Sequence, residues 1–132
     1  MQQRDLNMEK YEISKFAYRE LKYFCLQYEE KKARVASVVC LSATTYDGMP
    51  HSSSVGNPTE RKAMVASQLR GDCDIIEQSA NLAASYGCYQ QLMKNVTLGV
   101  PYHCLDIPCG KNQFTNMRRH FFFLLARKKG LV

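Results

Sequence analysis

The chain has 132 residues, 45% of them hydrophobic, and a formal net charge of +6. A chain of this length can bury one modest core, so we expect one domain with at most a small terminal lobe. No apolar run approaches the roughly 20 residues that a membrane-spanning helix needs, and we therefore expect no membrane partner.

The N-terminus and the cysteines both bear on location. Residues 1–12 are polar and mixed in charge, so they resemble neither a signal peptide nor a transit peptide, and we expect a frayed leader. The cysteines are scattered and show no paired framework, which is typical of reduced thiols. Both observations predict a cytoplasmic protein. The six cysteines are Cys25, Cys40, Cys73, Cys88, Cys104 and Cys109.

A first long helix is predicted over about 14–39. Ser14 can cap its start, and apolar residues follow at heptad-like steps, interrupted by Lys31. These residues are Ala17, Leu21, Phe24, Tyr28, Val35 and Val38. At 1.5 Å per residue this helix would be roughly 40 Å long, which is too long to be buried on all sides in so small a protein. It therefore needs a partner of similar length.

A second helix, predicted over about 58–85, supplies that partner. Asn57 is a typical N-cap, Pro58 suits the first helical position, and Glu60 can reach back to the cap amide. Gly87 is expected to terminate the helix. Its apolar stripe has the same spacing as that of the first helix and consists of Val65, Leu69, Cys73 (or Asp72), Ile76, Ala80 and Ala83. The two stripes predict a long antiparallel two-helix hairpin.

The segment 40–57 between these helices is predicted to be a loop. It contains Tyr46-Asp47-Gly48-Met49-Pro50 and the polar run 51–54, which are strong breaker signals. Loops this long are functional or disordered. Disorder is favoured because the segment offers little apolar surface, so deleting Ser52 to Ser54 is expected to leave the melting temperature nearly unchanged.

The last third is predicted to contain shorter elements. A helix from Cys88 to about Leu98 is followed by one or two helical turns at 102–106, a turn at 108–110 and a basic helix over about 112–129. The last three elements match a helix-turn-helix. We thus expect an all-α fold in two parts. Residues 1–98 form the hairpin, with its loop at 40–57, and a third helix; residues 99–132 form a helix-turn-helix lobe with a basic recognition helix.

The charge distribution points to the same basic helix. Residues 1–110 carry 12 basic and 12 acidic side chains, no acidic residue follows Asp106, and the entire net charge of +6 lies in residues 111–132. A basic amphipathic helix after a short turn is the usual electrostatic footprint of a nucleic-acid-binding module. The alternative is a solvated C-terminal helix whose Lys and Arg side chains complement its own dipole.

A helical wheel separates the two faces of this basic helix. The inward face is formed by Phe114, Met117, Phe121, Leu124 and Leu125. Phe123 falls on the polar side, and we interpret it as packing against the hairpin or against a second subunit.

The outward face supplies the candidate DNA-binding residues. In helix-turn-helix proteins the first turns of the recognition helix meet base edges and more distal cations meet phosphates. Because Asn and Gln side chains suit adenine, Gln113 and Asn116, with Thr115, are the candidate readers. Lys111, Arg119 and Arg127 are the candidate phosphate contacts. Asn112 shares the same face.

Metal, cofactor and catalytic chemistry are not expected. Cys104 and Cys109 have His103 and His120 nearby, but these histidines do not form the second close pair that a structural zinc site favours. We find no nucleophile paired with a base and no phosphate-binding glycine loop. The sequence therefore predicts a protein that is not an enzyme.

From Tyr11 to Lys129 the chain resembles the phage and prophage transcriptional regulators of the RinA/ArpU late-gene activator type, above all uncharacterised clostridial members. The motifs that carry this resemblance are Leu21-Lys22-Tyr23, Tyr46-Asp47-Gly48-Met49-Pro50, Gly56-Asn57-Pro58-Thr59-Glu60, Ile75-Ile76-Glu77, Gly99-Val100-Pro101-Tyr102, Pro108-Cys109-Gly110, Phe114 and Arg118-Arg119-His120-Phe121-Phe122. It implies a sigma-factor-like helix-turn-helix ending that activates late phage genes at a promoter.

Two functions are therefore predicted. The leading one is a sequence-specific regulator that binds double-stranded DNA, as a homodimer because operators mirror dimer symmetry. The alternative is a protein-interaction module whose basic helix docks RNA polymerase, or another phage or host protein, without binding DNA.

Overall fold

The structure is a computed structural model that describes residues 5–44 and 58–132. Every regular element in these two ranges is helical, which confirms the all-α fold class. Residues 40–44, expected to belong to the loop over 40–57, are helical, since the preceding helix continues to Thr44. Residues 45–57, with the rest of the expected loop, the motif at 46–50 and the start of the motif at 56–60, lie outside the described residues. The elements are η1 (Glu9–Tyr11), α1 (Lys15–Leu26), α2 (Tyr28–Thr44), α3 (Pro58–Ala83), α4 (Tyr89–Leu98), η2 (Tyr102–Cys104) and α5 (Lys111–Lys128).

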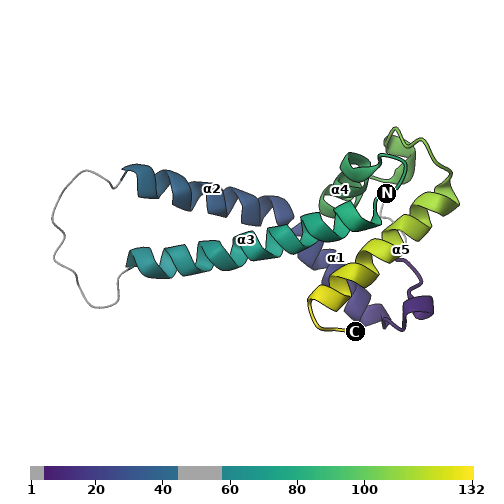
Figure 1. Cartoon of the computed structure of the whole chain (residues 1–132), viewed down its shortest axis with the longest axis horizontal. Helices are drawn as coiled ribbons and strands as arrows, with labels where there is room; N and C mark the ends of the chain where they lie inside the picture. The colour runs from purple at the N-terminus through teal and green to yellow at the C-terminus, as the bar shows by residue number, and fades with distance from the viewer. Residues whose placement is uncertain (1–4, 45–57) are drawn as a thin grey trace.

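The molecule consists of a body and an arm (Figure 1). The helices α2 and α3 lie side by side and antiparallel, and they project together from a body built by α1, α4, α5 and the C-terminal part of α3. With 26 residues, α3 is about 39 Å long and belongs to both parts. It is the element that joins the arm to the core.

The first predicted long helix is divided in two. Ser14 caps α1 as expected, because its Oγ accepts a hydrogen bond from the Ala17 amide at 3.1 Å. The α-helical hydrogen bonding then breaks at Gln27, so that α1 packs in the body against α4 and α5 while α2 pairs with α3. The expected helix over 14–39 is therefore wrong as a single element, because the body requires the chain to change partner at this point.

The lysine that interrupts the heptad-like stripe lies close to this break. Lys31 is only 8% exposed. Its Nζ lies 3.0 Å from a carboxylate oxygen of Asp72 and 3.9 Å from the centre of the Phe24 ring. The carboxylate and the ring together compensate the loss of hydration of the buried ammonium group.

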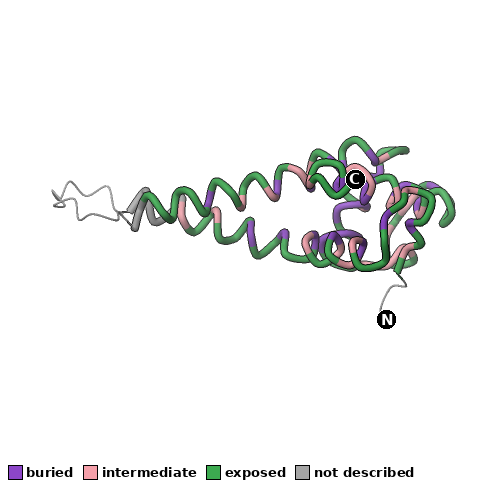
Figure 2. The backbone as a smooth tube through the Cα atoms, turned by 90° about the horizontal axis from the view of Figure 1, so that it is seen from below, coloured by how far each residue is buried: buried purple, intermediate pink, exposed green. Residues whose placement is uncertain are grey.

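The core lies in the body rather than in the arm. Figure 2 shows buried residues gathered in the body and a largely exposed arm. Tyr18 packs edge-on against Phe122, and Phe121 packs edge-on against the same ring, both with centroids 5.0 Å apart. The largest buried side chains come from all four long elements of the body: Tyr18, Leu21, Ile76, Leu92, Phe114, Phe121, Phe122 and Leu125.

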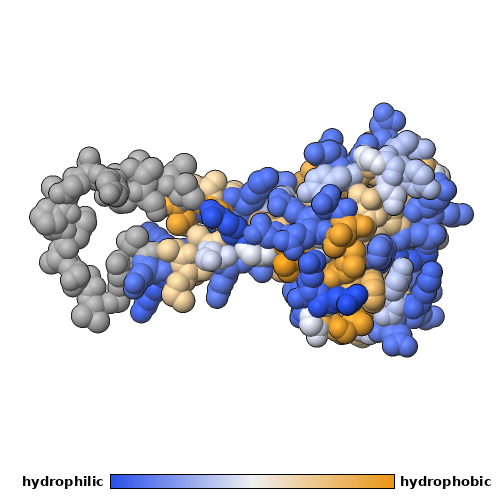
Figure 3. All heavy atoms as spheres, in the orientation of Figure 1, coloured by the Kyte–Doolittle hydropathy of each residue, from blue (hydrophilic) through white to orange (hydrophobic). Residues whose placement is uncertain are grey.

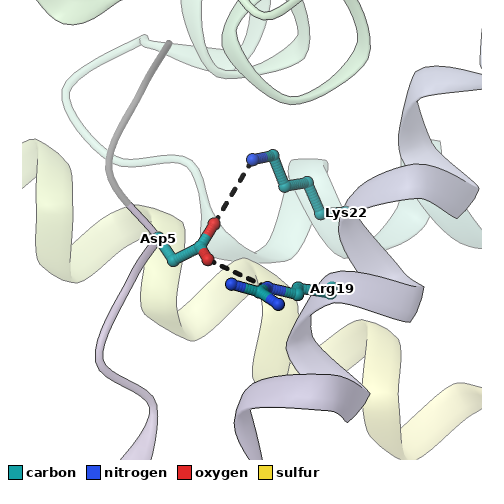
Figure 4. A network of polar contacts seen from close by, with 3 residues as sticks. All are labelled: Asp5, Arg19 and Lys22. Atoms are coloured by element: carbon teal, nitrogen blue, oxygen red, sulfur yellow. Dashed lines mark hydrogen bonds and ion pairs between the residues drawn. The ribbon is translucent and has the colours of Figure 1, made fainter.

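The N-terminal segment, expected to be a frayed leader, is part of the body from residue 5 onward. Met8 and Ile13 are buried in the core. Asp5 accepts hydrogen bonds from Arg19 at 3.1 Å and from Lys22 at 3.3 Å (Figure 4), and the Arg19 bond lowers the pKa of Asp5. The expectation was wrong because it was based on the mostly polar composition of the segment, whereas the few apolar side chains, Met8 and Ile13, are enough to bind the segment to the core.

Gly71 occupies the middle of α3 although nothing within the chain requires a glycine there. It is exposed, and a Cβ atom at this position would meet no atom within 4 Å. We expect Gly71→Ala to raise the free energy of unfolding by about 0.5–1 kcal/mol in dilute solution, since alanine is the better helix former. Urea denaturation measures the change. Gly87→Ala is the control and should lower the free energy of unfolding, because φ is +71° at Gly87. A lower free energy of unfolding for Gly71→Ala would contradict the prediction.

Candidate nucleic-acid interface

The basic helix α5 is held in the body by a wide apolar face. Its buried residues are Phe114, Met117, Phe121, Phe122, Leu125 and Ala126. It packs mainly against α3 and also against α1. Phe123, which fell on the predicted polar side, stacks on Tyr11 at a centroid distance of 4.8 Å. The N-terminal segment, rather than the expected hairpin or second subunit, thus contacts Phe123 on the side of α5 that the helical wheel assigned as polar.

The start of α5 is fixed by its own residues. The Gly110 amide donates a hydrogen bond to Oε1 of Gln113 at 3.0 Å, so the Gln113 side chain caps the N-terminal end of α5. Lys111, Asn112 and Gln113 are exposed around this first turn, and Thr115 is half-buried. The helical element expected before the turn at 108–110 is the single 3-10 turn η2. The Tyr102 hydroxyl stabilises the connection between η2 and α5 by donating a hydrogen bond to the Cys109 carbonyl at 2.7 Å.

Arg119, which is half-buried, makes two hydrogen bonds within its own chain. Its Nε donates to the Asn7 carbonyl at 3.1 Å, and its Nη1 donates to Oδ1 of Asn116 at 3.0 Å. The guanidinium group therefore ties α5 to the N-terminal segment and orients the neighbouring amide. Among the candidate DNA contacts, Arg119 is placed to position Asn116.

Other cations of the C-terminal end also stabilise the docking of α5. Lys128 donates to Gln78 at 3.2 Å, and Nζ of Lys129 lies 3.7 Å from the centre of the Phe24 ring. Arg118 lies beside Tyr18; burial lowers the pKa of its guanidinium group, and the Tyr18 hydroxyl acts in the opposite direction. Part of the positive charge that the sequence concentrates here thus has a structural role.

An exposed polar ridge remains along α5. We define it as Gln113, Asn116, His120 and Arg127, all of which are exposed. Their spacing of three, four and seven residues keeps them on one side of the helix, and the ridge is about 21 Å long. Arg127 lies over the Phe123 ring at 5.8 Å, which supports its side chain from below. The ridge contains no acidic residue.

A shallow cleft borders the first half of this ridge. It has a volume of about 280 Å³ and lies between the end of α3 and α5, with Tyr86 on one wall and Asn116 and His120 on the other. Tyr86 has a positive φ of 57° and an exposed ring. Sequence reasoning missed this tyrosine, since it lies outside any helix and reaches α5 only through the tertiary fold.

The thiols and histidines do not form a metal centre in the described ranges. No group of three or more His, Cys, Asp or Glu side chains is placed to hold an ion among these residues. Burial raises the pKa of the Cys25, Cys73 and Cys88 thiols, so these sulfurs are protonated at neutral pH. In the same ranges, no helix combines the length and apolar character needed to cross a membrane.

No protein-family model, curated protein or solved structure matches this chain. The resemblance to late-gene activators therefore stays a prediction that depends on the motifs alone.

Proposed function

We propose that this protein is a sequence-specific DNA-binding regulator that places the polar ridge of α5 in a major groove. The exposed, acid-free ridge is the observation that carries this proposal. A major groove is about 12 Å wide and admits one α-helix, and a ridge about 21 Å long reaches across one half-site.

The roles of the residues follow from their contacts. Gln113 and Asn116 lie in the first turns and are the base readers; the side-chain NH2 group of each is available to donate to adenine, whereas the side-chain oxygen of each accepts a hydrogen bond within the protein. Lys111 is exposed in the first turn of α5, and Arg127 is exposed at the far end of the ridge; both bind phosphates. Arg119 holds Asn116 in place. The likeness to phage late-gene activators supports a promoter as the target and RNA polymerase as a further partner.

Fluorescence anisotropy with duplex fragments of the flanking genome tests the proposal. One fragment should outcompete bulk DNA by at least about 1,000-fold. A basic helix that docks only a protein partner would show no such fragment, and this result would overturn direct DNA recognition in favour of the protein-interaction alternative.

The two phosphate contacts give a separate prediction. Lys111→Ala and Arg127→Ala should each weaken binding to any duplex and lower the slope of log K against log salt by about one unit, because each removes one phosphate contact. Titrations at two salt concentrations measure the slope. Lys94→Ala is the matched control, since Lys94 is exposed on α4 outside the ridge, and its slope should equal that of the wild type.

A further inference from the structure

The fold separates charges that cancel along the sequence. The ion pair between Lys31 and Asp72, at 3.0 Å, divides the α2–α3 pair into a base and an outer arm, which we define as residues 31–44 and 58–71. The outer arm contains six basic residues and one acidic residue, Glu60. Acidic residues gather instead at the base, at Glu29, Glu30, Asp72, Asp74 and Glu77. Only the packing of α2 against α3 brings the cations of the outer arm together.

Five of the six cations of the outer arm are exposed. Lys31 is buried and paired with Asp72, whereas none of the other five forms an ion pair with another described residue. These five are Lys32, Arg34, Arg61, Lys62 and Arg70. Figure 3 shows hydrophilic side chains on both helices of the arm. The outer arm therefore presents positive charge to the solvent over a length of about 21 Å.

The remaining surface of the outer arm is poor in apolar anchors. It contains no aromatic residue, and Met64 and Val65 are the exposed large apolar side chains among those that the structure describes there. Interfaces between proteins are enriched in aromatic residues, and a helix that lies on a membrane needs a broad apolar face. The exposed residues between the cations are instead mostly small: Ala33, Ala36, Ser37, Ala63, Ser67 and Gly71. Small side chains let a negatively charged backbone approach the helices closely.

We propose that the outer arm binds the phosphate backbone of double-stranded DNA without regard to base sequence. Lys and Arg side chains supply most of the sequence-independent affinity for DNA, and the length of the outer arm corresponds to about six base pairs. The outer arm is a second surface, distinct from the polar ridge of α5. The proposal is carried by the charges of α2 and α3 and does not require that the ridge reads bases.

Fluorescence anisotropy with a random-sequence DNA duplex, titrated at several salt concentrations, tests the outer arm. The variant Arg34→Gln/Arg61→Gln removes one exposed cation from each helix, and glutamine keeps a comparable helix propensity. It should weaken binding at least about 10-fold at about 0.1 M salt and lower the slope of log K against log salt by about two units, because each lost phosphate contact removes about 0.9 unit. The charge-conserving variant Arg34→Lys/Arg61→Lys should bind like the wild type.

The matched control is Lys15→Gln/Lys94→Gln, which removes the same charge from exposed positions of the body. It should bind like the wild type, and circular dichroism should show unchanged helix content in every variant. An equal loss of affinity in the control would assign the effect to net charge and overturn the proposal.

Two further results would also overturn it. A wild-type chain that does not bind the random-sequence duplex has no sequence-independent DNA contact at the outer arm. An Arg34→Gln/Arg61→Gln variant that binds like the wild type leaves the cations of the outer arm to an acidic protein. The absence of a preferred genomic fragment would instead contradict base reading by the ridge and would not change the result expected here, because the random-sequence duplex requires no base reading.

Discussion

Phe122→Ala should lower the free energy of unfolding by about 3–5 kcal/mol, because it removes a fully buried aromatic ring and leaves a cavity. Phe122 joins two parts of the core, since its ring packs edge-on against Tyr18 of α1 and against Phe121 of α5. The total free energy of unfolding of a domain of this size is about 5–15 kcal/mol, so the variant should lose a large share of its stability. Urea denaturation followed by circular dichroism measures the change.

Phe16→Ala is the matched control for this prediction. The same side chain is removed from a position in α1 that is 77% exposed. Its unfolding free energy should stay within about 0.5 kcal/mol of the wild type. Similar losses of unfolding free energy for Phe122→Ala and Phe16→Ala would contradict the core described above, because burial, rather than residue type, should decide how much stability the removal of a phenylalanine costs.

Gln113→Ala and Asn116→Ala should each cost about 1–3 kcal/mol of affinity for the specific duplex and hardly change the affinity for bulk DNA, because base-edge contacts carry the discrimination. Arg119→Ala should also reduce specific affinity, since it removes the hydrogen bond that orients Asn116. Its salt slope should change less than that of Arg127→Ala, because the Arg119 guanidinium group is bound to the Asn7 carbonyl. Competition titrations with specific and bulk duplexes measure both quantities.

Gln90→Ala is the control for the amide variants, since Gln90 is an exposed glutamine on α4. It should bind both duplexes like the wild type. Equal losses of specific and bulk affinity for Gln113→Ala and Asn116→Ala would show that these side chains do not read bases. An Arg119→Ala slope that falls as far as that of Arg127→Ala would instead make Arg119 a direct phosphate contact.

Local signals in the sequence were reliable where neighbouring residues decide the structure. The Ser14 cap, the buried positions Cys73, Ile76, Ala80 and Ala83 of α3 and the end of α4 at Leu98 all depend on residues within a few positions of one another. Val65, expected in the same stripe, is 50% exposed because it lies in the arm, away from the core. The inward face of α5 follows from helical periodicity alone, and each predicted inward residue is buried or half-buried. Periodicity could not show that Phe122 is buried too, because α3 covers one side of α5 and α1, through Tyr18, covers the adjacent side.

The sequence by itself determined that the chain is helical, which face of each helix is apolar, and where the positive charge lies. Tertiary structure decided the break at Gln27, the docking of the N-terminal segment and the part of α5 that stays exposed. The physical reason is the range of the interactions involved. Helix periodicity and capping act over one or two turns, whereas the contact between Arg119 and Asn7 joins residues 112 positions apart and exists only after the body has formed.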